Sequence, residues 1–105
     1  MSLVRESELQ HAVVELAHLR GWLVAHFRPA RLESGRVITP VSADGAGFPD
    51  LVLVRDRVLF VELKSERGRL APAQELWRDR LLQADAVWHV WRPADWPDLI
   101  DKELR

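Results

Sequence analysis

The chain has 105 residues, a net charge of −1, 48% hydrophobic and 30% charged residues, and no cysteine. These values predict one compact domain over residues 1–105, and they exclude a disordered chain, a disulfide framework and a thiolate metal site. No apolar run approaches the roughly 20 residues that cross a membrane, and the N-terminus lacks the features of a signal peptide, so we expect a cytoplasmic protein.

The distribution of apolar residues predicts a mixed α/β fold. Apolar side chains recur at helical spacing at the start of the chain until Gly21, and Pro72 suits the first position of a second helix. The expected elements are a helix over residues 4–20, strands over 22–27, 36–41, 51–54 and 58–63, a helix from 72, a strand over 87–91 and a helix over 95–104. The order α-β-β-β-β-α-β-α predicts a mixed β-sheet flanked by helices.

The third and fourth strands are continuous apolar runs, LVLV and VLFVEL, which are typical of central strands covered on both faces. If residues 55–57 form a three-residue turn, Val54 pairs with Val58 and Asp50 lies opposite Glu62. Opposed residues on neighbouring strands have Cβ atoms about 4.5–5.5 Å apart. A two-residue turn would instead place Asp50 opposite Leu63, and the sequence leaves this choice open.

Two carboxylates at such a distance can share one hard divalent cation, whereas without a cation their charges repel. Lys64 lies two residues after Glu62 and therefore shares its face of the strand. A metal that activates water, together with a cation that stabilises developing charge, is what phosphodiester hydrolysis requires. The alternative is an ordinary surface Glu–Lys pair beside a loop aspartate. The apolar run before Glu62 and the matched register favour the functional interpretation.

The run GFPDLVLVRDRVLFVELKSERGRLAPAQ resembles the VRR-NUC family of the PD-(D/E)XK nuclease superfamily, in the small form found in prokaryotes and phages. Pro49 and Asp50 match the PD element, and Glu62 to Lys64 match the (D/E)XK element. The likeness extends over nearly the whole chain, including the opening ESELQ and the late VWRPADW. One departure is Ala71, where relatives often have a serine before the proline. That change should weaken the helix cap by about 1 kcal/mol without removing a catalytic group.

The resemblance implies a restriction-endonuclease-like fold and Mg²⁺ or Mn²⁺ as the cofactor. By that resemblance Asp50, Glu62 and the backbone carbonyl of Leu63 bind the metal. Lys64 positions or activates the attacking water, and Gln74 supports the site from the start of the second helix. Gln74 could also bond only to backbone near that helix start.

Members of the family also carry a metal-binding glutamate on the first helix, and Glu6 and Glu8 are the two candidates. Glu6 borders the buried stripe of the helix and Glu8 continues a polar row, so we choose Glu6 as a catalytic and metal-binding residue. Two alternatives stay open. Glu6 could merely complement the helix N-terminus, or Ser7 could cap the helix with Gln10 and leave Glu6 outside it.

The segment after the motif is basic, as is the middle of the chain. Residues 20–69 hold nine Arg or Lys against six Asp or Glu. Ser65, Arg67 and Arg69 are candidates to contact a DNA backbone, although a strand-ending serine and a solvated loop are the plainer interpretations.

These observations predict a metal-dependent DNA endonuclease that recognises branched DNA or a Holliday junction rather than a base sequence. We expect DNA and a second copy of the chain as partners, in a prokaryotic cell or a phage-infected host, with no membrane and no nucleotide cofactor. The alternative is a noncatalytic DNA-binding or assembly subunit that retains the nuclease fold.

Overall fold

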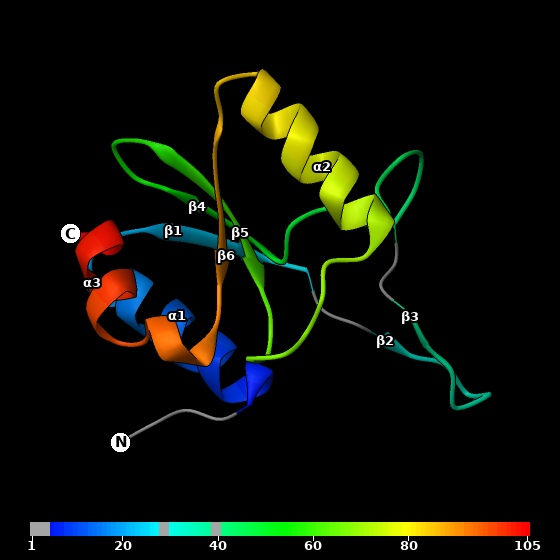
Figure 1. Cartoon of the computed structure of the whole chain (residues 1–105). Coiled ribbons are helices and arrows are strands. Elements are labelled where there is room, and N and C mark those ends of the chain that lie inside the picture. The colour runs from blue at the N-terminus through cyan, green and yellow to red at the C-terminus, as the bar shows by residue number, and fades with distance from the viewer. Residues whose placement is uncertain (1–4, 28–29, 39–40) are drawn as a thin grey trace.

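The computed structural model describes residues 5–27, 30–38 and 41–105. Figure 1 shows a sheet with α1 and α3 on one side and α2 on the other. Along the chain the elements are α1 (Glu6–Leu19), β1 (Leu23–His26), β2 (Ala30–Arg31), β3 (Val37–Ile38), β4 (Leu51–Val54), β5 (Val58–Leu63), α2 (Pro72–Gln83), β6 (Val87–Trp91), the 3₁₀ helix η1 (Pro93–Asp95) and α3 (Asp98–Leu104). The expected mixed sheet flanked by helices is confirmed.

The main sheet has the strand order β1-β4-β5-β6. The pairs β1–β4 and β4–β5 are antiparallel, and β6 runs parallel to β5. A parallel neighbour needs a long crossover connection, and α2 provides it. Because of this crossover, the end of β5 and the start of α2 are brought to one edge of the molecule, where polar side chains gather.

The register of the β4–β5 hairpin follows the three-residue turn. Val54 pairs with Val58 and Leu51 pairs with Val61, while the backbone N–H of Arg55 donates to the carbonyl of Arg57 within the turn. The alternative two-residue turn is therefore wrong. Asp50 lies immediately before β4, at the position that the same count sets opposite Glu62.

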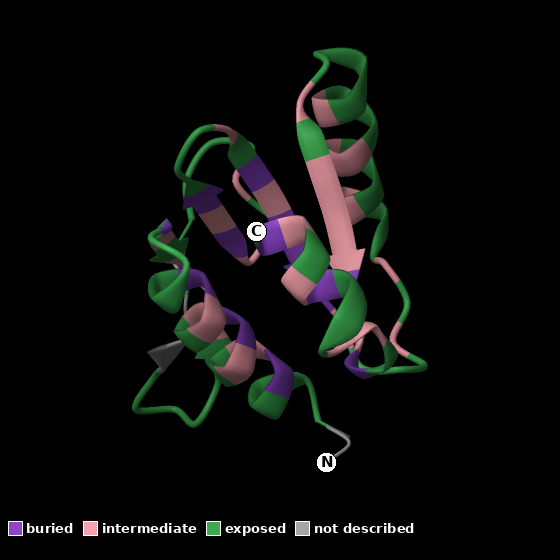
Figure 2. Ribbon diagram, turned by 90° about the vertical axis from the view of Figure 1, so that its left-hand side faces the viewer, coloured by how far each residue is buried: buried purple, intermediate pink, exposed green. Residues whose placement is uncertain are grey.

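The core lies between the sheet and the two helices α1 and α3. Its members are the buried residues Leu9, Val13, Ala17, Trp22, Leu51, Leu53, Leu59, Val61, Leu63, Trp91, Ile100 and Leu104. In Figure 2 these elements carry the buried purple segments, whereas α2 is only pink and green. The apolar stripe of α1 therefore has the partner that its spacing predicted.

The opposite face of the sheet is less completely covered than the apolar runs predicted. Val52 and Phe60 are only half-buried, and Val54 is 38% exposed. The helix α2 packs mainly against β6 and has no buried residue, and its Leu76 is 53% exposed. One face of the central strands is thus buried as expected, while the other keeps an open apolar area.

Three local predictions need correction. The strand expected over 36–41 is only Val37–Ile38, which pairs with the unpredicted β2 in a separate two-stranded ribbon; residues 39 and 40 lie outside the described residues, as does residue 4 of the expected first helix. The closing helix begins at Asp98, because the chain first turns through η1 and Pro97. Arg5 is the N-cap of α1, so Glu6 lies inside the helix and the Ser7 cap is wrong.

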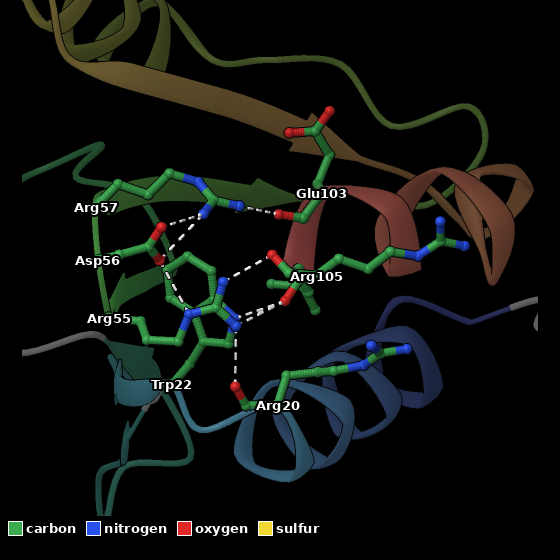
Figure 3. Close-up of polar contacts among 8 residues, drawn as sticks. Arg20, Trp22, Arg55, Asp56, Arg57, Glu103 and Arg105 are labelled. Atoms are coloured by element: carbon green, nitrogen blue, oxygen red, sulfur yellow. Dashed lines mark hydrogen bonds and ion pairs between the residues drawn. The ribbon is translucent and has the colours of Figure 1, made fainter.

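The hairpin turn also holds the last residues of the chain. Arg55 and Arg57 place their guanidinium carbons 4.6 and 4.9 Å from the ring centre of Trp22. Figure 3 shows the same two side chains reaching backbone carbonyls at the end of α3, and Arg55 donates to the carbonyl of Arg105 at 2.7 Å. Cation–π contacts and charge-assisted hydrogen bonds together fix α3 against the sheet. No helix among the described residues is long and apolar enough to cross a membrane.

Candidate active site

The candidate site lies where β5 ends beside the start of β4. Glu62 is a β5 residue with only 2% of its surface exposed, although its neighbours Val61 and Leu63 already fill the core on the opposite face. Asp50 is held at the same end, because its Oδ2 accepts a hydrogen bond from the backbone N–H of Leu63 at 2.8 Å. The hairpin thus brings the two acids together from opposite strands.

Burial and proximity change the protonation of the acid pair. Burial, then the charge of Asp50 and a hydrogen bond between the two carboxyl groups, together raise the pKa of Glu62 to about 8. Desolvation disfavours a carboxylate, and a second carboxylate at contact distance adds repulsion. Without a cation the pair therefore holds a proton at neutral pH.

Lys64 supplies one positive charge to this pair. Its Nζ lies 3.9 Å from Oε1 of Glu62, and its side chain is 17% exposed. The backbone N–H of Lys64 donates to the carbonyl of Trp91 at 3.1 Å, which continues the β5–β6 pairing past the end of β5. The amine is thereby placed beside the acids, but its charge lowers the pKa of Glu62 less than burial and Asp50 raise it.

Gln74 connects the acid pair to α2. Its Nε2 donates to Oε1 of Glu62 at 2.8 Å, and its Oε1 accepts the backbone N–H of Ala71 at 2.8 Å. The alternative that Gln74 bonds only to backbone is therefore wrong, because the same amide donates to Glu62 and accepts from Ala71. Its supporting role in the site stays a prediction. A full capping box also needs a side-chain oxygen on the N-cap residue, and Ala71 has none. Only the bond from the backbone N–H of Ala71 to the side chain of Gln74 is therefore present.

Glu6 reaches the site from the first turn of α1. It is exposed, yet partial burial and then the charge of Asp50 raise its pKa, while Lys64 lowers it. Glu6, Asp50 and Leu63 line a hollow of about 290 Å³, which we call the carboxylate hollow. Glu8 instead pairs with Arg5 at 3.7 Å and does not line this hollow.

The turn after Lys64 is fixed by a residue that the sequence did not single out. Arg92, directly after β6, donates from Nη1 to the carbonyls of Ser65 at 2.7 Å and of Gly68 at 2.6 Å. The side chain of Glu66 accepts the backbone N–H of Ala94. Arg92 directly follows β6, the strand that pairs with β5, and a basic residue at that position was the one feature of the sequence that could have indicated a contact near the end of β5.

The three candidate DNA contacts sit on this turn with different surroundings. Ser65 is exposed, and a Cβ added at Gly68 would lie 2.9 Å from its Oγ, so the turn is tight. Arg67 and Arg69 are exposed and make no hydrogen bond or ion pair with the described part of the chain. They lie near the acid pair in sequence but do not contact it.

The donor chemistry of the acid pair suits a hard divalent cation. Two carboxylates meet at one point, and their mutual repulsion is relieved either by a proton or by a metal. Within residues 5–27, 30–38 and 41–105 no three His, Cys, Asp or Glu side chains form a group that could hold a metal. Mg²⁺ commonly binds proteins through one or two carboxylates and keeps waters and substrate phosphates as its other ligands. The pair fits that pattern.

Comparison with known proteins gives a concordant result. The family model of the VRR-NUC domain matches residues 6–92, which includes every candidate site residue named above. A solved structure described as a VRR-NUC domain aligns with a TM-score of 0.63 and 25% sequence identity, over 95% of this chain and 94% of that chain. A comparison with curated proteins finds no match.

Proposed function

Because the chain belongs to the VRR-NUC family, a group of nuclease-type domains for which DNA is the implied substrate, we propose that it is a divalent-metal-dependent DNA endonuclease. The observation that carries this proposal is the acid pair, in which Glu62 is buried and Asp50 is half-buried. Glu62 is 2% exposed and faces Asp50, with Lys64 as a nearby cation. A side chain in the core costs less if it is apolar, so a buried acid beside another acid indicates a function.

Each residue has a proposed role. Asp50 and Glu62 would hold Mg²⁺ or Mn²⁺, with the backbone carbonyl of Leu63 as a further ligand. Glu6 lines the carboxylate hollow but, within the described residues, does not form a three-residue metal group with the pair, so its carboxylate would have to move towards them to bind the metal. When bound, the metal supplies a Lewis acid that lowers the pKa of water and neutralises phosphate charge. Lys64 orients the attacking water and stabilises the charge that develops on the phosphate. Gln74 fixes the rotamer of Glu62 through its 2.8 Å hydrogen bond.

The proposed substrate is DNA recognised by its structure. The described part of the chain contains no helix-turn-helix or other separate base-reading unit. Ser65, Arg67 and Arg69 lie on the turn directly after Lys64, where phosphate contacts would position a duplex without reading its sequence. Branched DNA, including four-way junctions, offers a distinct shape at such a surface.

A homodimer is part of the proposal. Leu23, Val54 and Val58 form one cross-strand row, and they are 75%, 38% and 42% exposed. Such a row on the open face of a sheet is costly in water and would be covered by a second copy of the chain. Two active sites related by a twofold axis suit paired cuts on a symmetric junction. Sedimentation of the wild type and of Leu23→Glu tests this step, since a dimer through this row should dissociate in the variant.

The function is tested by cleavage of linear, flapped and four-way DNA with Mg²⁺, Mn²⁺ or EDTA. We expect cutting only with a metal, and loss of cutting in Asp50→Asn and Glu62→Gln. Asp98→Asn, an exposed acid of α3, is the matched control and should cut as the wild type does. Cutting in EDTA, or undiminished cutting by Asp50→Asn, contradicts the mechanism. Salt-sensitive DNA binding without any cleavage would favour a noncatalytic subunit.

A further inference from the structure

A second hollow lies next to the acid pair, and apart from Asp50 and Gln74 its lining has no part in the mechanism above. Its volume is about 580 Å³, within the range of about 300–1,000 Å³ typical of ligand sites. Asp50 and Gln74 line it on the side of the active site. The other lining residues are Phe27, Phe48, Val41, Ser42 and the segment 45–47. We call it the aromatic pocket.

The walls of the pocket are aromatic rings with fixed positions. Phe27 and Phe48 meet edge to face, with ring centroids 5.3 Å apart and an angle of 87°. Phe48 makes the same kind of contact with Phe60 at 6.1 Å and with Trp77 at 4.9 Å. Phe27 is the exposed end of this cluster, with 43% of its surface accessible. It therefore offers a flat apolar surface beside the active site.

The floor of the pocket is built from small residues that cannot be enlarged. A Cβ at Gly47 would lie 2.4 Å from the carbonyl carbon of Ala73, and Gly47 has a φ of +84°, which favours glycine. The indole Nε1 of Trp77 donates to the carbonyls of Asp44 at 3.0 Å and of Ala46 at 3.2 Å, which ties this loop to α2. Figure 1 shows the loop between β3 and β4 beside the start of α2. These contacts fix the loop that forms one side of the aromatic pocket.

The charge of the lining indicates whether the pocket would take a phosphate or a base of a nucleic acid. Of the described residues that line the pocket, only Asp50 is charged, and its charge is negative. The described lining contains no lysine or arginine that would hold a phosphate in this pocket, whereas the uncharged ring of Phe27 offers a stacking surface to a neutral base. Only an unpaired base can leave its neighbours and enter a pocket of this kind, because a paired base would first have to be pulled from the duplex.

We propose that the aromatic pocket binds an unpaired nucleobase of the strand that is cut, adjacent to the scissile phosphate at Asp50. This inference rests on the proposed nuclease function and deepens it, because it names the substrate class as DNA with unpaired nucleotides, such as flaps, gaps and the open centres of branches. The base anchors the strand so that its next phosphate lies at the acid pair.

The experiment measures equilibrium binding in EDTA, so that no cleavage occurs, with a fluorescent single strand, a flap and a fully paired duplex of the same sequence. Phe27→Ala should weaken binding of the single strand and the flap by about 5- to 150-fold, the effect of removing one stacking ring. Duplex binding should change less than 2-fold. Phe27→Trp should restore binding, and Leu99→Ala, an exposed apolar residue of α3, should behave as the wild type.

A second readout needs no variant. In the wild type, removing single bases along the flap should weaken binding at one nucleotide, and a 2-aminopurine at that nucleotide should lose fluorescence on binding because it stacks. Equal binding of every abasic flap, or Phe27→Ala equal to the wild type, overturns the pocket while leaving the nuclease proposal intact. Base-dependent binding without metal-dependent cleavage supports the pocket and overturns the nuclease proposal. If Phe27→Ala changes only the oligomeric state, the pocket is a contact between copies.

Discussion

Replacing Glu62 by glutamine should stabilise the metal-free protein at alkaline pH while it abolishes cleavage. Burial, then the charge of Asp50, raises the pKa of Glu62 to about 8, from 4.5 for the free group. The folded protein therefore binds a proton that the unfolded chain has released between these two pH values. The stabilising protonated state is fully present below pH 4.5 and is lost as the pH rises through about 8. Glutamine resembles the protonated acid and removes this dependence.

The size of the effect follows from the two pKa values. The gap between 4.5 and about 8, at 1.36 kcal/mol per pH unit, corresponds to about 5 kcal/mol of lost stability above pH 8. Domains are usually stable by only about 5–15 kcal/mol. Most of this loss has already occurred by pH 7, so the metal-free wild type should be several kcal/mol less stable at pH 9 than at pH 4.5, on the order of the pKa gap, whereas Glu62→Gln should change little.

Urea unfolding in EDTA at pH 4.5, 7 and 9 measures this difference. The free energy of unfolding of the wild type should fall over this range, that of Glu62→Gln should stay nearly constant, and the two should agree at pH 4.5. Glu33→Gln, an exposed acid of the β2–β3 turn, controls for a general loss of charge. Adding Mg²⁺ at pH 9 should restore only the wild type, because a ligand that binds the folded state stabilises it. Parallel pH profiles for the wild type and Glu62→Gln would refute the reasoning.

Three further outcomes are expected. Lys64→Ala should lower the single-turnover cleavage rate on the order of 10²- to 10³-fold, the usual effect of losing one group that stabilises developing charge. The control Lys102→Ala should cut as the wild type does. A loss of less than tenfold in Lys64→Ala would contradict the proposed role of Lys64. Arg92→Ala should lower the free energy of unfolding in urea by about 1.5–3 kcal/mol, because its charge-assisted hydrogen bonds to the carbonyls of Ser65 and Gly68 are lost. A change within experimental error would mean that the turn after Lys64 is stable without Arg92. Arg67→Ala should reduce the slope of log binding constant against log salt by about 0.9 if its side chain meets one phosphate, and an unchanged slope would remove it from the DNA surface.

The hairpin could be predicted closely because its determinants are local. Two apolar runs separated by three charged residues define both strands and the turn, and the observed register runs from Val54↔Val58 to Leu51↔Val61 as counted. A shift of one residue would turn the apolar side chains of β5 away from the core. The positions of Asp50 and Glu62 follow directly from that constraint.

The remaining features depend on contacts between distant segments. Arg92 is separated by 24 residues from the Gly68 carbonyl that it binds, and no spacing rule connects them. The ribbon of β2 and β3 has two residues in each strand, too few for a periodic signal. The exposure of Leu76 depends on where α2 crosses the sheet, which its own apolar spacing does not specify.

Asp50 lines both hollows, and under the two proposals this arrangement would separate cutting from substrate choice. It lines both the carboxylate hollow and the aromatic pocket, and its carbonyl accepts the backbone N–H of Phe27 at 3.1 Å. The backbone at Phe27 is therefore fixed to the acid whatever side chain it carries. A change of the Phe27 ring should alter which DNA is held without moving the carboxylate, whereas a change at Asp50 should remove cutting of every substrate. The ratio of the cleavage rates on flap and duplex DNA should then change in Phe27 variants. Asp50 variants should cleave neither substrate, so that no ratio can be measured.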